Sequence, residues 1–108
     1  MPQGLMRGVS LKFLDAVAVG VQNGSTIANL PRAALVTWQT SYPTSPGSIT
    51  MLIQGSNDDI NWNTIDTSTV VTGEIRTFQT SAKFLRARIN AVVGGDFATV
   101  EVVAKPIG

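Results

Sequence analysis

The residues best suited to chemistry lie together in one stretch, GSNDDINW, at positions 55–62. Four of its side chains carry carboxylate or amide oxygens, the ligands that Ca²⁺ prefers: Asn57, Asp58, Asp59 and Asn61. The spacing does not match an EF-hand loop, which needs alternating ligands, a central glycine and a distant glutamate. Asn and Asp also favour tight turns. The stretch therefore indicates a turn first, and a loose calcium loop second.

Carboxylates are also the groups that hydrolyse glycosidic bonds, and Asp58, Asp59 and Asp66 lie close in the sequence. Such a pair needs a cleft that raises one pKa, whereas a loop this polar is expected to be solvated. The chain has no histidine and no cysteine, so the commonest general base and the thiol nucleophile are both missing. We predict a protein that is not an enzyme, with no catalytic, cofactor-binding or metal-ligating residue assigned.

Aromatic residues provide a second kind of site, because their faces stack on sugars. The alternating pattern places Trp38 with Val36, and Trp62 with Ile60, so both tryptophans are predicted to lie in the core. Tyr42 lies in the proline-rich segment SYPTSPGS and is predicted to be the most exposed aromatic. A carbohydrate-binding module that uses Tyr42 and the 55–63 turn is therefore the alternative function.

Charge excludes other classes of partner. Eight Lys and Arg against seven Asp and Glu give a net charge of +1, without a basic patch or tail. Arg86 and Arg88 on one strand are fewer than a nucleic-acid surface needs, and they indicate either a solvated strand face or a protein contact. No segment reaches the roughly 20 apolar residues of a membrane span. We expect neither a nucleic acid nor a membrane as partner.

Composition and periodicity predict an all-β fold. Val, Ile and Thr make up 32 of the 108 residues, and turn signals recur every eight to twelve residues. These features are typical of an antiparallel β-sandwich or jelly roll of seven to eight strands. The predicted inward faces of four segments are Val36 with Trp38, Ile49 with Met51 and Ile53, Leu85 with Ala87, Ile89 and Ala91, and Ala98 with Val100, Val102 and Ala104.

Two turn signals suggest local connections. Asn23-Gly24 in QNGST is predicted to end the first strand segment with a turn. Gly94-Gly95 is predicted to join the last two strands as an antiparallel hairpin, which would place Arg86 or Arg88 across from Glu101.

The expected organisation is an extended N-terminal arm (1–8), one β-sandwich domain (9–105) and a short C-terminal tail (106–108). The amino terminus is interpreted as an arm rather than a signal peptide, because Lys12 and Asp15 interrupt its apolar run. Only 14% of the residues are charged, which suggests that a partner covers part of the surface. The predicted interface residues are Leu5, Met6, Arg7, Tyr42, Arg86, Arg88, Pro106 and Ile107.

The segment LIQGSNDDINWNTIDT resembles the strand–turn–strand pattern of discoidin-like sandwiches, and a related pattern in small β-sandwich virion proteins of tailed bacteriophages. The phage resemblance continues through LPRAALVTWQT, FLRARINAVVGG and ATVEVVAK, and covers roughly residues 25 to 105. Asp59 stands where the discoidin-like turn has glycine, and the tryptophan after the turn, Trp62 here, packs inside the sandwich in that group. The chain is also shorter than a full discoidin domain and lacks cysteine.

The phage resemblance implies a structural protein of the virion, located at the capsid surface. Its expected role is to decorate or cement the capsid by binding the major capsid protein and its own copies, as a homotrimer. No cofactor is implied.

Overall fold

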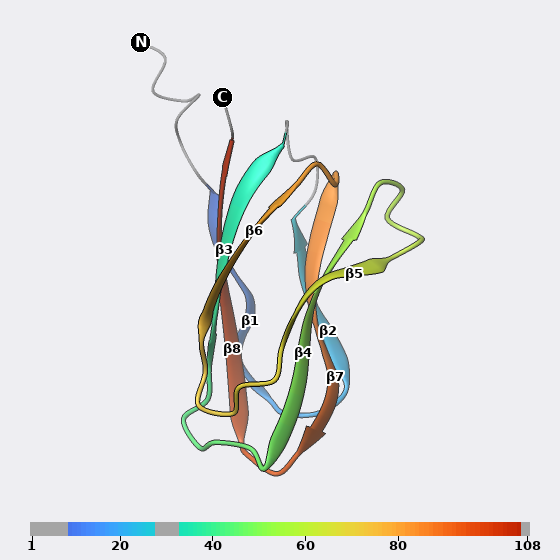
Figure 1. Ribbon diagram of the computed structural model, residues 1–108. Coiled ribbons are helices and arrows are strands. Elements are labelled where there is room, and N and C mark those ends of the chain that lie inside the picture. Colours follow the sequence, from blue (N-terminus) through green and yellow to red (C-terminus); the bar gives the residue numbers. More distant parts are fainter. Residues whose placement is uncertain (1–8, 28–32, 107–108) are drawn as a thin grey trace.

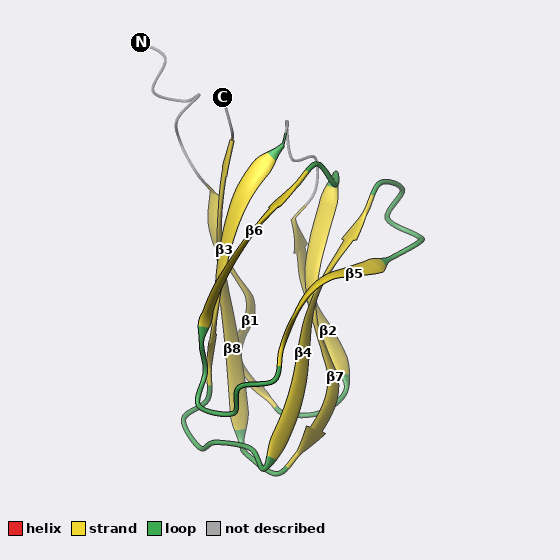
Figure 2. Ribbon diagram, viewed as in Figure 1, coloured by secondary structure: helices red, strands yellow, loops and turns green. Residues whose placement is uncertain are grey.

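The computed structural model describes residues 9–27 and 33–106, which form eight β-strands (Figures 1 and 2). The strands are β1 (Val9–Ala18), β2 (Gln22–Ile27), β3 (Ala34–Ser41), β4 (Ser48–Ser56), β5 (Asn63–Ser68), β6 (Ile75–Thr80), β7 (Phe84–Val93) and β8 (Phe97–Pro106). No helix in this part of the chain is long and apolar enough to cross a membrane. The predicted arm (1–8) and the last two residues lie outside the described residues.

The strands form two four-stranded sheets packed face to face (Figure 1). Sheet A has the order β1-β8-β3-β6 and sheet B has the order β2-β7-β4-β5, and every pairing is antiparallel. Consecutive strands alternate between the sheets except at β4 and β5, which form a hairpin. This order is that of a jelly roll. The all-β sandwich predicted from the sequence is confirmed.

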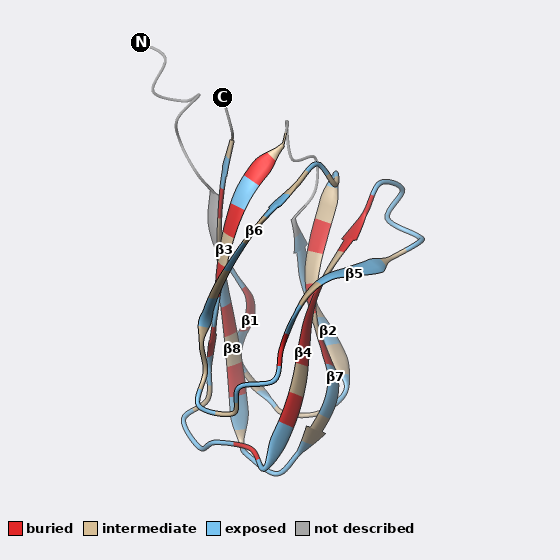
Figure 3. Ribbon diagram, in the orientation of Figure 1, coloured by how far each residue is buried: buried red, intermediate tan, exposed pale blue. Residues whose placement is uncertain are grey.

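The core lies between the sheets and consists of the inward positions of each strand (Figure 3). Its largest fully buried side chains include Trp38 and Met51. The predicted inward faces of β3, β4 and β8 are confirmed, because each of their named residues is buried. On β7 the pattern fails at Ala91, which is exposed, because the register with β4 shifts between Thr50 and Met51.

The predicted hairpin of the last two strands is wrong. β7 pairs with β2 and β4 in sheet B, whereas β8 pairs with β1 and β3 in sheet A. Gly94 and Gly95 both have positive φ, and their loop carries the chain from one sheet to the other. Glu101 consequently lies beside Lys12 and Gln39, not beside an arginine of β7.

The turn predicted at Asn23-Gly24 is also wrong, because both residues lie within β2. Gly24 is needed there for a different reason: a Cβ at this position would overlap the carbonyl oxygen of Phe13 in β1. Opposite it, β1 has two register shifts, and Phe13 and Leu14 are both buried although they are adjacent in sequence. A β-bulge produces this arrangement by turning two successive side chains toward the same side.

Candidate functional site

The 55–63 stretch forms the turn between β4 and β5, as the sequence predicts, and Asp58 organises it. One carboxylate oxygen, Oδ1, accepts hydrogen bonds from the Ser56 hydroxyl at 2.8 Å, the Ile60 N–H at 2.9 Å and the Asn61 N–H at 2.8 Å. The other oxygen accepts from the Asn61 side-chain amide at 2.7 Å. The carboxylate thus takes the place of backbone acceptors inside the turn.

These donors also determine the protonation of Asp58. The backbone N–H groups of Asn61 and Ile60, followed by the side chains of Asn61 and Ser56, hold the pKa of Asp58 well below its usual range. Asp59 occupies the position where the discoidin-like turn has glycine, and its φ of 60° is left-handed, a conformation that Asp tolerates. Among the described residues no group of three or more His, Cys, Asp or Glu side chains is placed to hold a metal ion.

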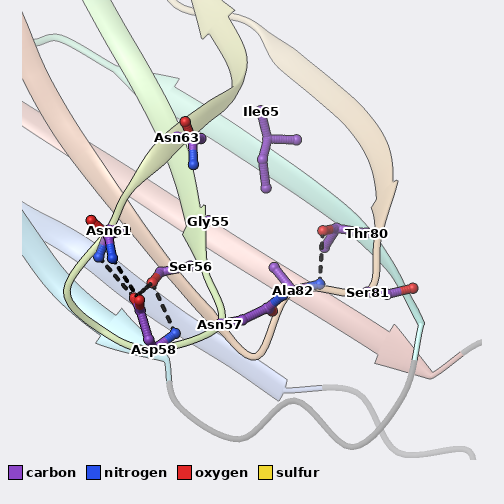
Figure 4. A pocket seen from close by; sticks show the side chains of 10 residues that line it. All are labelled: Gly55, Ser56, Asn57, Asp58, Asn61, Asn63, Ile65, Thr80, Ser81 and Ala82. Carbon is purple, nitrogen blue, oxygen red and sulfur yellow. Dashed lines mark hydrogen bonds between the residues drawn. The ribbon is translucent and has the colours of Figure 1, made fainter.

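An open pocket of about 510 Å³ lies beside this turn (Figure 4). One wall consists of the turn with Asn63 and Ile65 of β5. The other consists of residues 80–82, at the end of β6 and in the loop to β7. The lining is mostly uncharged hydrogen-bonding side chains, with Gly55, Ile65 and Ala82 as an apolar part.

The prediction that Trp62 lies in the core is wrong. Ile60 is 79% exposed at the tip of the turn, and Trp62 is only partly buried. The Arg86 guanidinium lies 4.2 Å from the centre of the Trp62 ring, a cation–π contact. Arg86 also donates to the Gln54 side chain at 2.9 Å. Alternation does not continue through the turn, which explains the error.

Arg86 and Arg88 therefore lie on the outer face of sheet B, where their partners are polar or aromatic. Arg88 donates to Asn23 of β2 at 2.9 Å. Burial is the main cause that lowers the pKa of Arg86, and the neighbouring Arg88 charge acts in the same direction. The two arginines thus connect neighbouring strands within the sheet. Their role in an interface stays a prediction.

Tyr42 does not lie near the 55–63 turn. It follows the end of β3, whereas the turn follows the far end of β4, so the nine residues of β4 separate them by about 30 Å. Tyr42 is half-buried, packs against the core and has a buried hydroxyl without a hydrogen-bond partner in the described chain. Burial is the main cause that raises its pKa. The predicted exposed aromatic platform is therefore wrong.

A polar cluster that the sequence did not reveal lies between β5 and β6, the neighbouring edges of the two sheets. Asp66 accepts hydrogen bonds from the buried Trp38 indole N–H at 2.9 Å and from Arg76 Nε at 3.0 Å to each oxygen. Glu74 lies 3.4 Å from Arg76 and accepts from the Ser68 hydroxyl at 2.5 Å. Asp66 is thus a structural residue between the sheets, away from Asp58.

The opposite end of the sandwich from the 55–63 turn has a second ordered group of loops, which we call the Asp96 end. It comprises residues 19–21, 42–47 and 93–97. The Asp96 carboxylate accepts from Thr44 N–H at 3.2 Å, Thr44 Oγ1 at 2.9 Å and Phe97 N–H at 2.6 Å. Its backbone carbonyl accepts from Val19 at 2.9 Å. One residue therefore fastens three loops together, and the bond from Phe97 is the main cause that lowers its pKa.

Three large apolar side chains are exposed at the Asp96 end. Val21 is 60%, Val93 is 66% and Phe97 is 46% exposed. Phe97 pairs with Ala18 in sheet A, next to the bond from Val19 to Asp96, whereas Val93 pairs with Ser48 in sheet B. Single exposed apolar residues are common at protein surfaces, but these three lie at or beside loops that Asp96 holds by hydrogen bonds.

The remaining predicted interface residues are placed only in part. Pro106 is the last residue of β8, at the end of the sandwich that also holds the 55–63 turn. Leu5, Met6, Arg7 and Ile107 lie outside the described residues, so their role stays a prediction.

Comparison with known proteins defines the class of fold. No family model matches the chain, and no curated protein sequence matches it. Three solved structures share the fold over nearly the whole chain. The SPBc2 prophage-derived protein YomS has a TM-score of 0.65 at 11% identity, with 92% of this chain and 94% of that chain covered.

The second is a subunit structure from disulfide-linked pili, the Bacillus endospore appendages, with a TM-score of 0.55 at 14% identity and coverage of 95% and 91%. The third is the K1 cleaved adhesin domain of Lys-gingipain from Porphyromonas gingivalis, with a TM-score of 0.58 at 13% identity and coverage of 94% and 75%. At these identities the likeness defines a jelly-roll sandwich and carries no further property to this chain.

Proposed function

We propose that this protein is a non-enzymatic structural component of a phage particle. It decorates or cements the capsid by binding the major capsid protein and further copies of itself, as an oligomer for which the sequence resemblance implies three subunits. The observation that carries the proposal is the Asp96 end, where hydrogen-bonded loops expose Val21, Val93 and Phe97. Preordered loops lose little conformational entropy on binding, so apolar contacts there convert efficiently into affinity.

Two further observations support this role. The fold is shared with a prophage-derived protein and with a subunit of bacterial appendages, although the likeness concerns the fold alone. The chain also has few charges and neither histidine nor cysteine. These features suit a structural component that acts through binding and not through catalysis.

The direct test is retention of the purified protein on empty, undecorated capsids. A double variant, Val93→Asp with Phe97→Asp, is expected to bind at least about tenfold more weakly, because two carboxylates would be desolvated in an apolar contact. Ile60→Asp is the matched control, since Ile60 is at least as exposed but lies at the other end of the sandwich. Absence of wild-type retention rejects the capsid role, and equal retention of both variants rejects the Asp96 end as the contact.

Carbohydrate binding is the second candidate, and the pocket beside the 55–63 turn favours it. The Asn63 and Ser81 side chains line this pocket and are exposed, so both can serve a ligand. If a glycan binds, Asn63→Ala is expected to lower the affinity for it roughly tenfold, because hydrogen bonds to the ligand are lost. Ser48→Ala, an exposed change at the other end of β4, is the control. Silence of the wild-type protein on a glycan array removes this candidate.

A further inference from the structure

The four strands at the sheet edges differ in regularity. β1 and β6 are the edges of sheet A, and β2 and β5 are the edges of sheet B. The register of β1, β2 and β5 with their neighbours is interrupted in each case. The register of β6 with β3 runs without interruption from Ile75 to Thr80. Bulges twist an edge away from further pairing, so β6 is the one described edge strand without this protection.

The direction in which β6 offers its backbone groups follows from one hydrogen bond. The Thr40 N–H donates to the Glu74 carbonyl at 3.0 Å, one step before the first β6 pair. Hydrogen-bonded and non-hydrogen-bonded pairs alternate along an antiparallel ladder. Arg76, Phe78 and Thr80 therefore bond toward β3. Every second residue turns its N–H and C=O to the open edge, and these residues are Ile75, Thr77 and Gln79.

The chemistry of β6 also permits a further strand. The three residues with open backbone groups are uncharged, none is proline, and Ile75 is 62% exposed. The single charge of the strand, Arg76, is held by Asp66 and Glu74. Edge strands that resist pairing usually carry lysine, proline or an inward-pointing charge. The one such feature on β6 is Arg76, and its charge is compensated by Asp66 and Glu74.

We propose that β6 pairs with β6 of a second copy of this chain about a twofold axis, so that sheet A continues into an eight-stranded sheet. The partner strand is β6 of a second copy, because the other described edge strands of that copy are bulged and only its β6 has a regular register. Contacts between identical edges are self-complementary and close as a dimer. The proposal goes beyond the proposed function, because it assigns self-association to a surface distinct from the Asp96 end. A twofold contact also gives two subunits, where the sequence resemblance implies three.

The register of this contact follows from the open backbone groups. Centring the axis on Thr77 lets all three open residues pair: Thr77 faces the partner's Thr77, and Ile75 faces the partner's Gln79. This register makes roughly six backbone hydrogen bonds between the copies. No like charges face each other directly, because the charged residue of the strand, Arg76, faces the partner's Phe78.

The test is a charge exchange at Thr77, an exposed residue, followed by sedimentation equilibrium. The wild-type protein is expected to be a dimer at micromolar concentrations. Thr77→Lys alone and Thr77→Glu alone are each expected to raise the dimer dissociation constant at least tenfold or so, because like charges meet on the axis. An equimolar mixture of the two variants is expected to associate again, as a heterodimer with opposite charges facing.

Ser41→Lys adds the same charge at an exposed position of central strand β3 and is expected to leave the dimer intact. Circular dichroism and melting curves establish that each variant is folded. Should Thr77→Lys fail to fold, Thr77→Pro removes the outward N–H without adding a charge, and it is expected to separate the copies as well.

Three results overturn the inference: a wild-type monomer at millimolar concentration, an oligomer that neither charge weakens, or folded variants that do not associate when mixed. Capsid retention is measured separately. The Thr77 variants keep the Asp96 end, so loss of the dimer and loss of capsid binding are distinguishable.

Discussion

Replacement of Asp66 by alanine is expected to lower the free energy of unfolding by about 2 kcal/mol. The Asp66 carboxylate accepts the indole N–H of Trp38, which is buried, and its removal leaves that donor without a partner. The same change leaves Arg76 without the carboxylate that it contacts at 3.0 Å. Because the Arg76 side chain keeps 41% of its surface in water, whereas Trp38 is buried, most of the expected loss comes from the indole. Urea denaturation of both proteins measures the difference.

The effect should depend on pH with a defined sign. Burial acts to raise the pKa of Asp66, but the hydrogen bonds from Arg76 and Trp38 outweigh it, and the net pKa is lowered. The folded protein therefore binds this proton less readily than the unfolded chain does. The stability that Asp66 contributes is fully present above the unfolded pKa of about 4, and it is lost as the pH falls through the folded pKa. The wild-type advantage over Asp66→Ala should shrink in acid.

Two comparisons separate this cluster from surface charge in general. Asp66→Asn keeps an acceptor for Trp38 and loses the charge, so an intermediate stability is expected. Asp15→Ala removes an exposed carboxylate 3.6 Å from Lys12 and is expected to change the free energy of unfolding by less than about 0.5 kcal/mol. Equal losses for Asp66→Ala and Asp15→Ala would show that Asp66 does not hold the sheets together.

The inward faces of the strands could be predicted because burial on one side imposes a period of two on the residues themselves. Val36 with Trp38, and Val100 with Val102, follow this rule and are buried. The pairing of strands could not be predicted in the same way. Gly94-Gly95 allows a tight change of direction, but nothing local decides whether the next strand joins the same sheet or the opposite one.

Tertiary contacts also override the local sequence patterns that predict turns and buried positions. Asn23-Gly24 favours a turn by its own chemistry, yet Gly24 lies inside β2 because the backbone of Phe13 approaches it too closely for a side chain. Trp62 lies beyond a turn, where the alternation of β4 no longer applies, and its ring meets Arg86 from a different strand.

The candidate sites also differ in whether their partners are near or distant in sequence. Asp58 works within its own turn, so its neighbours in sequence were enough to predict its role. Asp66 and Arg76 lie on different sheets, and Asp96 joins loops from distant parts of the chain. Their partners are fixed by the jelly-roll order, which a single sequence does not display.

Gly73, in the loop before β6, is the position where a single methyl group should have the largest effect. Its φ of +88° is left-handed, a conformation that costs a side-chain-bearing residue about 1–2 kcal/mol. A Cβ there would also overlap the carbonyl oxygen of Thr40, which belongs to β3 and cannot move without disturbing the ladder to β6. Gly73→Ala is therefore expected to lower the free energy of unfolding by about 3 kcal/mol.

Gly20→Ala is the matched control, because a Cβ at Gly20 meets nothing within 4 Å and its φ is not left-handed. We expect that change to be neutral, or stabilising by about 0.5 kcal/mol through the unfolded chain. Thermal and urea unfolding of the two variants measure the contrast. If both variants lose the same free energy of unfolding, the loss is common to any replacement of a loop glycine. The close approach of Gly73 to Thr40 then does not require glycine at this position. If only Gly73→Ala loses it, this approach fixes where β6 begins against β3.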